Sequence, residues 1–333
     1  MSDQFKALVL NQEGENFTRQ IKSIDKNFLK HGDVTIKVDY SDLNFKDGMI
    51  LKNGGRLVKE FPHIPGIDFS GSVLESENSK FKSGDEVILT GFRVGEIFYG
   101  GYSQIAKVNG DFLVKKPKDL TSKQAMILGT AGFTSLMAAF SIKENEKVFP
   151  NEKIKNVLVT GATGGVGSIA TVILNKMGYN VTAVSGKESK TDFLKSLGAK
   201  SVINRSDFDK DPKLIDKGLW DGVVDTVGGK ILANAIVQTN SNGVIAVCGN
   251  ASTNELNTNV IPFMLRGIKL YGMDSANCNI NRREIIWGEA AKLVDFSLLE
   301  KSIKIVSLEE LIETYPKILK GEISGRVLVD LNK

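Results

Sequence analysis

Glycines at a strand-to-helix turn are the residues whose types and spacing most directly indicate chemistry. Gly161, Gly164 and Gly167 stand three residues apart in VTGATGGVGS, after the apolar run NVLV and before a helical pattern. Glycines in that setting let backbone N–H groups approach a phosphate and let the helix pack against the strand. A kinase-type loop is excluded, because no Gly-Lys-Ser/Thr follows. The turn predicts a bound dinucleotide; the alternative is a tight turn without a ligand.

The end of the following strand predicts which dinucleotide is bound. In the NAD form an acidic side chain at this position accepts hydrogen bonds from the ribose. Here the strand NVTAVS ends at Ser185, followed by Gly186 and Lys187, and Arg205 follows the next strand. A hydroxyl with cations favours a 2′-phosphate, which a carboxylate would repel. We therefore expect NADPH, with ordinary solvated surface charges as the alternative interpretation.

Cysteine and histidine are too few and too scattered to indicate a metal site. The chain has two cysteines, Cys248 and Cys278, and two histidines, His31 and His63, and no pair has ligand spacing. No metal is predicted. Cys248 is interpreted as a packed residue, since no histidine stands near it in sequence to activate it. The absence of a disulfide framework predicts a cytoplasmic protein.

The elements that must position these residues fall into two patterns. The first 120 or so residues read as short strands with partial alternation, typical of a small, curled, mostly antiparallel barrel. From Thr121, a long helix with Thr121 or Ser122 as N-cap leads into alternating strands and helices, which predict a doubly wound parallel sheet. Two further helices and a terminal strand, GRVLVDL, end the chain.

Composition limits the possible partners. The 333 residues are 41% hydrophobic and 25% charged, with a formal net charge of +4. That balance, without a dense Lys/Arg run, gives no basis for a nucleic-acid partner. The N-terminal residues do not read as a signal peptide, and no stretch approaches the roughly 18 apolar residues of a membrane helix. A soluble protein without a membrane partner is expected.

This arrangement resembles the medium-chain dehydrogenase/reductase superfamily, in its zinc-independent form. The stretches DLNFKDGMILKNGG and FPHIPGIDFSG occupy the place where zinc alcohol dehydrogenases carry metal ligands, and here Asn44 and the pair Ile67-Asp68 stand there. The resemblance implies an α/β protein. Its Rossmann NADPH-binding domain (125–268) would be inserted in a GroES-like, mostly-β barrel domain (1–124 and 269–333).

Several strings are similar to the acrylyl-CoA reductase group, also labelled quinone oxidoreductases: SDLNFKD, IPGIDFSG, GTAGFTSLMAA, VSGKES, DTVGG and PFMLRGIKLYGMDS. The group implies a cytoplasmic homodimer that reduces acrylyl-CoA to propanoyl-CoA with NADPH. Hydride would add to the β-carbon, and hydrogen-bond donors rather than a metal would stabilise the enolate oxygen. The alternatives are a reductase of quinones or α,β-unsaturated ketones, and a cofactor-binding structural or regulatory protein without turnover.

The same resemblance implies a set of site residues. The cofactor contacts would be Phe45, Gly161, Thr163, Gly164, Gly165, Val166, Gly167, Ser185, Gly186, Lys187, Arg205, Asn250, Met264, Ser275 and Gly321. Phe45 stands where tyrosine is usual, Lys187 where arginine is commoner, and Asn250 where an apolar residue is usual.

Near the substrate carbonyl, the resemblance implies Asn44 and Arg326 as catalytic polar groups, with Asp47 and Asp68 orienting them. Each has a plain structural alternative: a turn-forming Asn44, a turn-capping Asp68 and an exposed cation at Arg326. The phosphates of an acyl-CoA would need a basic rim. The candidates are Lys52, Arg56 and Lys59, with a solvated loop as the alternative.

Overall fold

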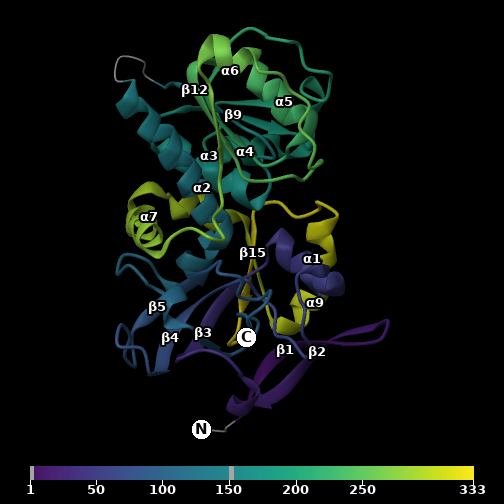
Figure 1. Cartoon of the computed structure of the whole chain (residues 1–333), viewed down its shortest axis with the longest axis vertical. Helices are drawn as coiled ribbons and strands as arrows, with labels where there is room; N and C mark the ends of the chain where they lie inside the picture. The colour runs from purple at the N-terminus through teal and green to yellow at the C-terminus, as the bar shows by residue number, and fades with distance from the viewer. Residues whose placement is uncertain (1–3, 150–153) are drawn as a thin grey trace. The chain divides into compact units, whose positions relative to one another are not determined.

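A computed structural model describes residues 4–149 and 154–333, which divide into two compact units (Figure 1). Unit 1 comprises the chain to Thr130, Ser275–Ala291 and Ser302–Lys333, and unit 2 comprises Ala131–Asp274 and Lys292–Lys301. These limits lie a few residues beyond the predicted domain boundaries. They also assign the short stretch before Ser302 to unit 2.

Unit 1 is built on a mostly antiparallel sheet, in which the pairing order of the described strands is β14-β15-β3-β4-β5-β7, with β6 on β3. The strands are β3 (Val34–Asp42), β4 (Asp68–Ser76), β5 (Glu86–Thr90), β6 (Ile105–Val108), β7 (Val114–Lys115), β14 (Ile303–Val306) and β15 (Arg326–Asp330). β15 pairs with β3 in the register Leu328 to Asp42. The last strand of the chain is therefore laid beside one of the first.

A hairpin and several helices pack with this sheet in the described part of unit 1. β1 (Gln4–Glu13) and β2 (Asn16–Asp25) form the hairpin, and the helices are α1 (Phe45–Asn53), α9 (Leu308–Leu319) and most of α7 (Ile280–Leu293). α9 packs on α1 so closely that a Cβ at Gly48 would lie 2.7 Å from Ile318 Cγ2. A capping box between Ser307 and Glu310 begins α9. β2 and α1 were not among the elements predicted from the sequence.

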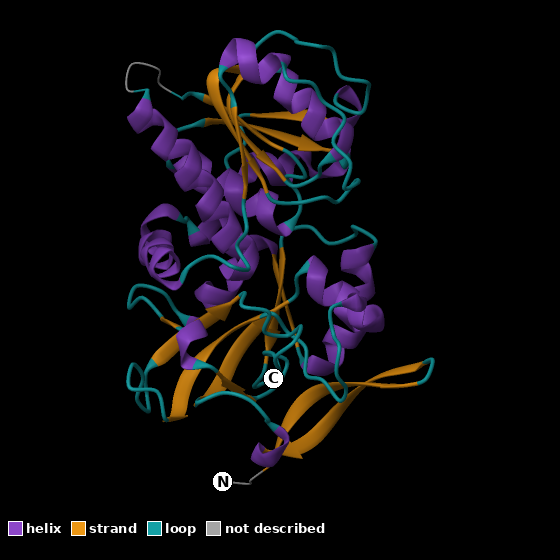
Figure 2. Cartoon of the chain, viewed as in Figure 1, coloured by secondary structure: helices purple, strands orange, loops and turns teal. Residues whose placement is uncertain are grey.

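Unit 2 contains the predicted doubly wound parallel sheet, with helices on its faces (Figure 2). The strand order is β10-β9-β8-β11-β12-β13, which is the 3-2-1-4-5-6 order of dinucleotide-binding sheets. The strands are β8 (Asn156–Val159), β9 (Asn180–Ser185), β10 (Ser201–Asn204), β11 (Trp220–Asp225), β12 (Thr239–Val247) and β13 (Lys269–Gly272). The order reverses between β8 and β11, where such sheets bind their ligands.

Four helices of unit 2 lie between these strands in the chain: α3 (Gly165–Lys176), α4 (Thr191–Ser196), α5 (Gly229–Val237) and α6 (Ile261–Arg266). The short helix α8 (Phe296–Leu299) follows α7 and also belongs to unit 2. Ile169, Ala170 and Ile173 of α3 are fully buried. The four residues of β8 read NVLV, and all but the first are buried, as expected for a strand covered on both faces.

The long helix α2 (Ser122–Val148) begins as predicted. Thr121 is its N-cap, because its hydroxyl accepts the N–H of Gln124 and the Gln124 side chain accepts the N–H of Thr121. Contrary to expectation, its composition and length would suffice to cross a membrane, but 89% of the apolar window is buried inside the protein. The helix is also interrupted at Gly129, where φ is 51° and ψ is −151°.

Candidate functional site

The glycine turn of unit 2 has a backbone that only glycine accommodates. Gly161 has a φ of 58°, and a Cβ there would lie 2.2 Å from Thr226 Oγ1. A Cβ at Gly167 would lie 2.5 Å from the carbonyl oxygen of Gly161. The first glycine therefore makes the turn, and the last lets α3 approach the strand end.

The N-terminus of α3 fits a phosphate group. Its N-cap is Gly164, which has no side chain to bond the first N–H groups of the helix, at Gly165, Val166 and Gly167. Those N–H groups point out of the helix end and carry its positive partial charge. Thr163, the residue before the cap, is buried. The predicted phosphate contacts thus lie on one turn, and their chemistry suits a dinucleotide.

A buried carboxylate holds this turn in place. Asp225, at the end of β11, accepts a 2.6 Å hydrogen bond from the Thr160 hydroxyl and a 2.8 Å bond from the N–H of Gly228. The Thr226 hydroxyl donates to the carbonyl of Thr160 at 2.9 Å. Burial raises the pKa of Asp225, opposed by these donors. The ends of β8 and β11 are thereby locked beside each other at the switch point of the sheet.

Cations gather at the carboxyl end of β9. The Ser185 hydroxyl accepts the N–H of Lys187 at 3.0 Å, and the guanidinium of Arg205 lies over Gly186, 3.1 Å from the position of a Cβ there. The acid nearest in sequence, Glu188, accepts a hydrogen bond from Asn204. The structure therefore brings the four predicted residues together, with a hydroxyl and two cations where an acid would mark the NAD form.

Two predicted cofactor residues lie further along unit 2. Asn250 follows β12, at the same edge of the sheet, and Met264 lies on α6 with 72% of its surface exposed. Cys248, also after β12, donates from its thiol to the carbonyl of Asp225. Burial and the Asp225 charge raise the pKa of the Cys248 thiol to about 12, which leaves it unreactive.

In unit 1 the predicted catalytic residues meet in a buried polar cluster. The Asn44 amide donates to Asp42 at 2.6 Å and to Asp68 at 2.8 Å, and its oxygen accepts from Arg326 at 3.1 Å. Arg326, only 4% exposed, pairs with Asp42 and donates to the carbonyl of Ile127. Both amide protons of Asn44 are thus engaged, whereas three of the five N–H donors of Arg326 are used.

Asp47 acts on the backbone around this cluster. Its carboxylate accepts the N–H of Asn44 at 2.9 Å, which closes a capping box at the start of α1. The other oxygen accepts the N–H of Ile67 at 3.0 Å. The two segments that carry Asn44 and Asp68 are therefore joined through one side chain.

Burial dominates the electrostatics of the cluster. Burial and the neighbouring Asp68 raise the pKa of Asp42 well above its ordinary value, against the pull of Arg326. Burial and Asp68 raise the pKa of Asp47 to about 7, opposed by the N–H groups of Asn44 and Ile67. The carboxyl groups of Asp42 and Asp47 therefore hold protons more tightly than they would in water.

The interruption of α2 completes the cluster. After Gly129 the N–H and hydroxyl of Thr130 both donate to Asp68, each at 2.6 Å. A Cβ at position 129 would lie 1.7 Å from Asp42 Oδ2, so this residue must be glycine. Gly129 and Thr130 were not among the predicted site residues, because the string GTAGFTSL reads as plain helix. Asp42 was not among them either, because it is the last residue of an ordinary strand.

The three remaining predicted residues belong to unit 1 but make none of the hydrogen bonds described for this cluster. Phe45 begins α1 and is 51% exposed. The carbonyl of Ser275 accepts from the buried Arg283, and Gly321, with a φ of 67°, follows α9. Their predicted contacts with a cofactor remain predictions.

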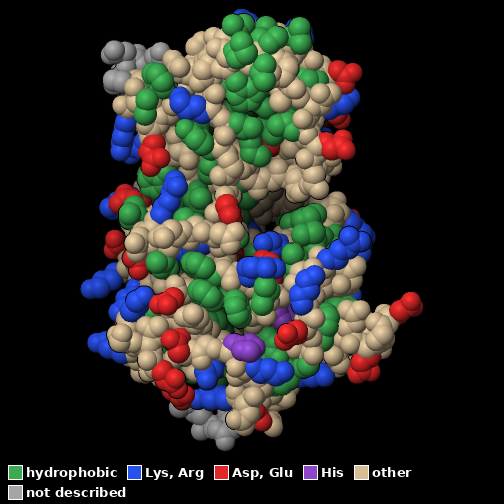
Figure 3. Space-filling model, viewed as in Figure 1, with side chains coloured by type: hydrophobic (Ala, Val, Ile, Leu, Met, Phe, Trp, Pro, Cys, Tyr) green, Lys and Arg blue, Asp and Glu red, His purple; other side chains and the backbone are tan. Residues whose placement is uncertain are grey.

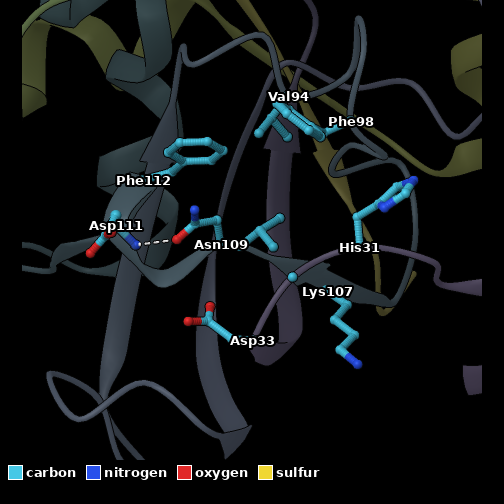
Figure 4. Close-up of a pocket in the computed structure, with 10 residues that line it drawn as sticks. His31, Asp33, Val94, Phe98, Lys107, Asn109, Asp111 and Phe112 are labelled. Atoms are coloured by element: carbon cyan, nitrogen blue, oxygen red, sulfur yellow. Dashed lines mark hydrogen bonds between the residues drawn. The ribbon is translucent and has the colours of Figure 1, made fainter.

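An open pocket of about 450 Å³ lies elsewhere in unit 1 (Figure 4). It is lined by His31, Gly32, Asp33, Val94, Phe98, Lys107, Val108, Asn109, Asp111 and Phe112. Asp33 is already bonded to the N–H of Gly110, and Lys107 points away from the ring of Phe112. None of the predicted site residues lines it.

The candidate metal ligands do not assemble. Among residues 4–149 and 154–333, no group of three or more His, Cys, Asp and Glu side chains is placed to hold a metal ion. In the polar cluster of unit 1, the positive charge that faces Asp42 is the guanidinium of Arg326.

Known proteins match both units. Residues 30–118 match the alcohol dehydrogenase GroES-like domain, and residues 165–293 match the zinc-binding dehydrogenase domain. The acrylyl-CoA reductase AcuI of Ruegeria pomeroyi is 42% identical over 98% of this chain and 99% of its own. The Bacillus subtilis protein YhfP, provisionally named a quinone oxidoreductase, is 42% identical over 99% of this chain and all of its own.

Solved structures agree in fold. YhdH of Escherichia coli K-12 with NADPH bound has a TM-score of 0.93 at 41% identity, covering 98% of this chain and 100% of that one. The structure of YhfP with NAD bound also has a TM-score of 0.93, at 40% identity, covering 99% of this chain and 100% of that one. The chain therefore belongs to the medium-chain dehydrogenase/reductase family.

Proposed function

We propose that this protein reduces the activated C=C bond of an α,β-unsaturated acyl thioester, acrylyl-CoA to propanoyl-CoA, with NADPH as the reductant. Bound NADPH supplies a hydride to the β-carbon of the substrate. The electron pair of the C=C bond moves onto the thioester oxygen as an enolate, and a proton added at the α-carbon completes the saturated product. The identity to acrylyl-CoA reductase AcuI across nearly the whole chain supports this substrate class.

Arg326 is the residue we assign to the enolate oxygen. Its guanidinium keeps two N–H donors beyond those bonded to Ile127, Asn44 and Asp42. Fixed donors aimed at a developing negative charge are the usual means of stabilising such an oxygen. Asn44, Asp47 and Asp68 would then be positioning residues that hold the guanidinium and the start of α1.

The observation that carries the choice of NADPH is the end of β9. Ser185, Lys187 and Arg205 present a hydroxyl and two cations there, and the acid nearest in sequence, Glu188, is bonded to Asn204. A 2′-phosphate carries up to two negative charges, which this group of side chains would neutralise.

The activity is tested by mixing the purified protein with NADPH or NADH and following the loss of reduced-nicotinamide absorbance. Acrylyl-CoA, crotonyl-CoA and a simple quinone are the substrates. Saturable turnover of acrylyl-CoA with NADPH is expected. Turnover of the quinone alone would support a quinone or enone reductase instead, and NADPH binding without any turnover would support a cofactor-binding protein.

Cofactor choice is tested with Lys187→Glu. We expect kcat/KM for NADPH to fall by about tenfold or more relative to NADH, because the substituted carboxylate repels the 2′-phosphate. NADPH binding, followed by nicotinamide fluorescence, should weaken in parallel. Lys195→Glu, an exposed change on α4, is the control and should leave both values unaltered. Equal losses for NADPH and NADH in Lys187→Glu would refute the assignment.

We further propose a cytoplasmic homodimer without nucleic-acid or membrane partners. β13 lies at the edge of the sheet of unit 2, and its Leu270 and Tyr271 are exposed. Val260, Met264 and Leu265, before and on α6, are each at least 65% exposed. An open strand edge beside apolar side chains favours a self-complementary contact around a two-fold axis.

A further inference from the structure

The exposed face of α1 changes in character along its length. Phe45, Met49 and Lys52 are four and then three residues apart, so they follow one face of the helix. Phe45 is exposed and Met49 half-buried, whereas Lys52, Arg56 and Lys59 beyond them are all exposed. Asn44, the N-cap of the same helix, lies in the polar cluster that holds Arg326. One face of α1 therefore runs from the polar cluster past apolar side chains to Lys52, and Arg56 and Lys59 follow in the chain just after the helix.

The cations have no ion-pair partner among the described residues. The salt bridges of unit 1 involve other lysines and arginines, such as Lys46 with the buried Glu96 at 2.7 Å. The one exposed acid in this stretch is Glu60, beside Lys59. Lysine and arginine side chains gather on this part of the surface, over the region of α1 and α9 (Figure 3). The group is thus available to bind an anion.

The backbone that carries these cations is fixed. The turn after α1 is closed by the N–H of Leu57 and of Val58, both of which donate to the carbonyl of Gly54. Within it Arg56 has a φ of 59°, a left-handed conformation that costs a non-glycine residue free energy and is found preferentially at functional sites.

Arg19 of β2 holds the end of α1 from the other side. Its guanidinium donates to the carbonyls of Leu51 and Lys52 and lies over the rings of Phe17 (4.9 Å) and Tyr315 (5.6 Å). A cation also suits this helix end, where the carbonyl groups carry negative partial charge. The position of Lys52 is therefore set by two elements that lie far apart in sequence.

We propose that this face of α1 binds the coenzyme A part of the substrate: Phe45 and Met49 contact the pantetheine arm, and Lys52, Arg56 and Lys59 bind the phosphates. The proposal rests on the proposed function. Seven helical positions from Phe45 to Lys52 span about 10 Å at 1.5 Å per residue, and the turn to Arg56 and Lys59 extends the path. An extended thioester arm needs such a separation between its carbonyl and its phosphates, whereas a quinone has no group for the cations.

The proposal is tested with the triple variant Lys52→Glu/Arg56→Glu/Lys59→Glu. Its kcat/KM is measured with acrylyl-CoA and with the acrylyl thioester of N-acetylcysteamine, which ends before the phosphates. We expect the value for acrylyl-CoA to fall by about tenfold or more, and the value for the short thioester to stay within about twofold. Lys22→Glu/Lys30→Glu/Lys118→Glu, three exposed lysines elsewhere on unit 1, is the control with the same change in charge.

A binding measurement gives a second readout. CoA should inhibit wild-type turnover more strongly than dephospho-CoA or pantetheine, and the triple variant should lose this preference. An unchanged response to acrylyl-CoA, or equal losses on both thioesters, would overturn the phosphate site. It would leave the proposed function standing, provided that the wild type reduces acrylyl-CoA. A wild type that reduces only the quinone would overturn the proposed function itself, and the phosphate site with it.

Discussion

Arg326 is important both for the stability of unit 1 and for the proposed reaction. It is buried among carboxyl groups, and its bonds reach β3, the start of α1 and the carbonyl of Ile127 in α2. Removing one partner from a buried ion pair leaves the other charge without compensation. The same guanidinium is the donor that we assign to the enolate oxygen, so stability and activity should fall together.

Arg326→Gln should lower the free energy of unfolding by about 3–5 kcal/mol, as measured by urea denaturation. At a temperature low enough for Arg326→Gln to remain folded, its kcat should be reduced by about a hundredfold. Arg326→Lys keeps the charge but lacks the planar guanidinium, so its free energy of unfolding and its kcat should lie between those of wild type and Arg326→Gln. Arg282→Gln, an exposed change on α7, should behave as wild type. Full activity in Arg326→Gln would remove Arg326 from the mechanism.

A second residue-scale prediction concerns acid. His63 is 2% exposed, and burial lowers the pKa of its imidazole, which bonds the carbonyl of Gly95 at 3.0 Å. At His63 the unfolded chain then binds a proton more readily than the folded chain, so the stability contributed by the neutral imidazole is lost as pH falls below about 6.5. The loss is at most about 1.4 kcal/mol per pH unit, until the folded pKa is passed.

Urea denaturation between pH 7.5 and 5 tests this effect. His63→Asn should be less stable than wild type at pH 7.5 but should lose less stability on acidification. His31→Asn, which removes the exposed histidine, should keep the wild-type slope. Parallel pH profiles for wild type and His63→Asn would contradict the prediction.

Residues that act locally could be read from the sequence, and those that act through the fold could not. The turn is predicted by the local pattern of Gly161, Gly164 and Gly167, because strand, glycines and helix are adjacent in the sequence. No local pattern predicts the role of Asp42. It is the last residue of an ordinary strand, and its role arises because β15 pairs with β3 and brings Arg326 to it.

At the scale of elements, the interruption of α2 does the most to shape the site. Because the chain departs from helical geometry at Gly129, the carbonyl of Ile127 accepts from Arg326, and the N–H of Thr130 is donated to Asp68. Alternation and capping predicted that a helix starts at Thr121, but a glycine inside an apolar helical pattern does not reveal a kink. The carboxyl groups of Asp42 and Asp68 and the guanidinium of Arg326 lie where a Cβ would stand, which explains why glycine is required.

Gly129→Ala should therefore be far more destabilising than the replacement of a glycine whose φ is positive but whose Cβ position is open. Gly84 supplies the control, since its φ is 88° and a Cβ there meets nothing within 4 Å. Gly84→Ala should cost about 1–2 kcal/mol, whereas Gly129→Ala should cost more than about 4 kcal/mol or fail to fold. Thermal unfolding of the two variants gives the comparison, and similar melting temperatures would contradict it.

At the scale of the whole molecule, alternation of strands and helices was enough to predict the parallel sheet and its place inside the chain. The polypeptide leaves unit 1 near Thr130 and returns at Ser275. The stretch Lys292–Lys301 belongs to unit 2, which the sequence did not predict, because no local pattern separates it from the helices around it. The sequence predicted β13 as a strand, but its position at the edge of the sheet follows only from the observed strand order.

The proposed homodimer gives the prediction at this scale. Leu270→Asp/Tyr271→Asp on β13 should shift the protein from dimer to monomer in sedimentation equilibrium, because a charge in the core of a two-fold contact is repelled by its own copy. Leu256→Asp, an exposed apolar residue outside that strand, should remain dimeric. A dimer that persists in the double variant would place the contact elsewhere.

The pairing of β15 with β3 also affects how the protein is made. In chain order Asp42, Asp47 and Asp68 precede unit 2, and Arg326 follows it. The three acids therefore lack their counter-charge until Arg326 is synthesised, and by then every residue of unit 2 has been made. We expect the nascent chain to complete its inserted unit first, and to close the unit that encloses it only after β15 has left the ribosome.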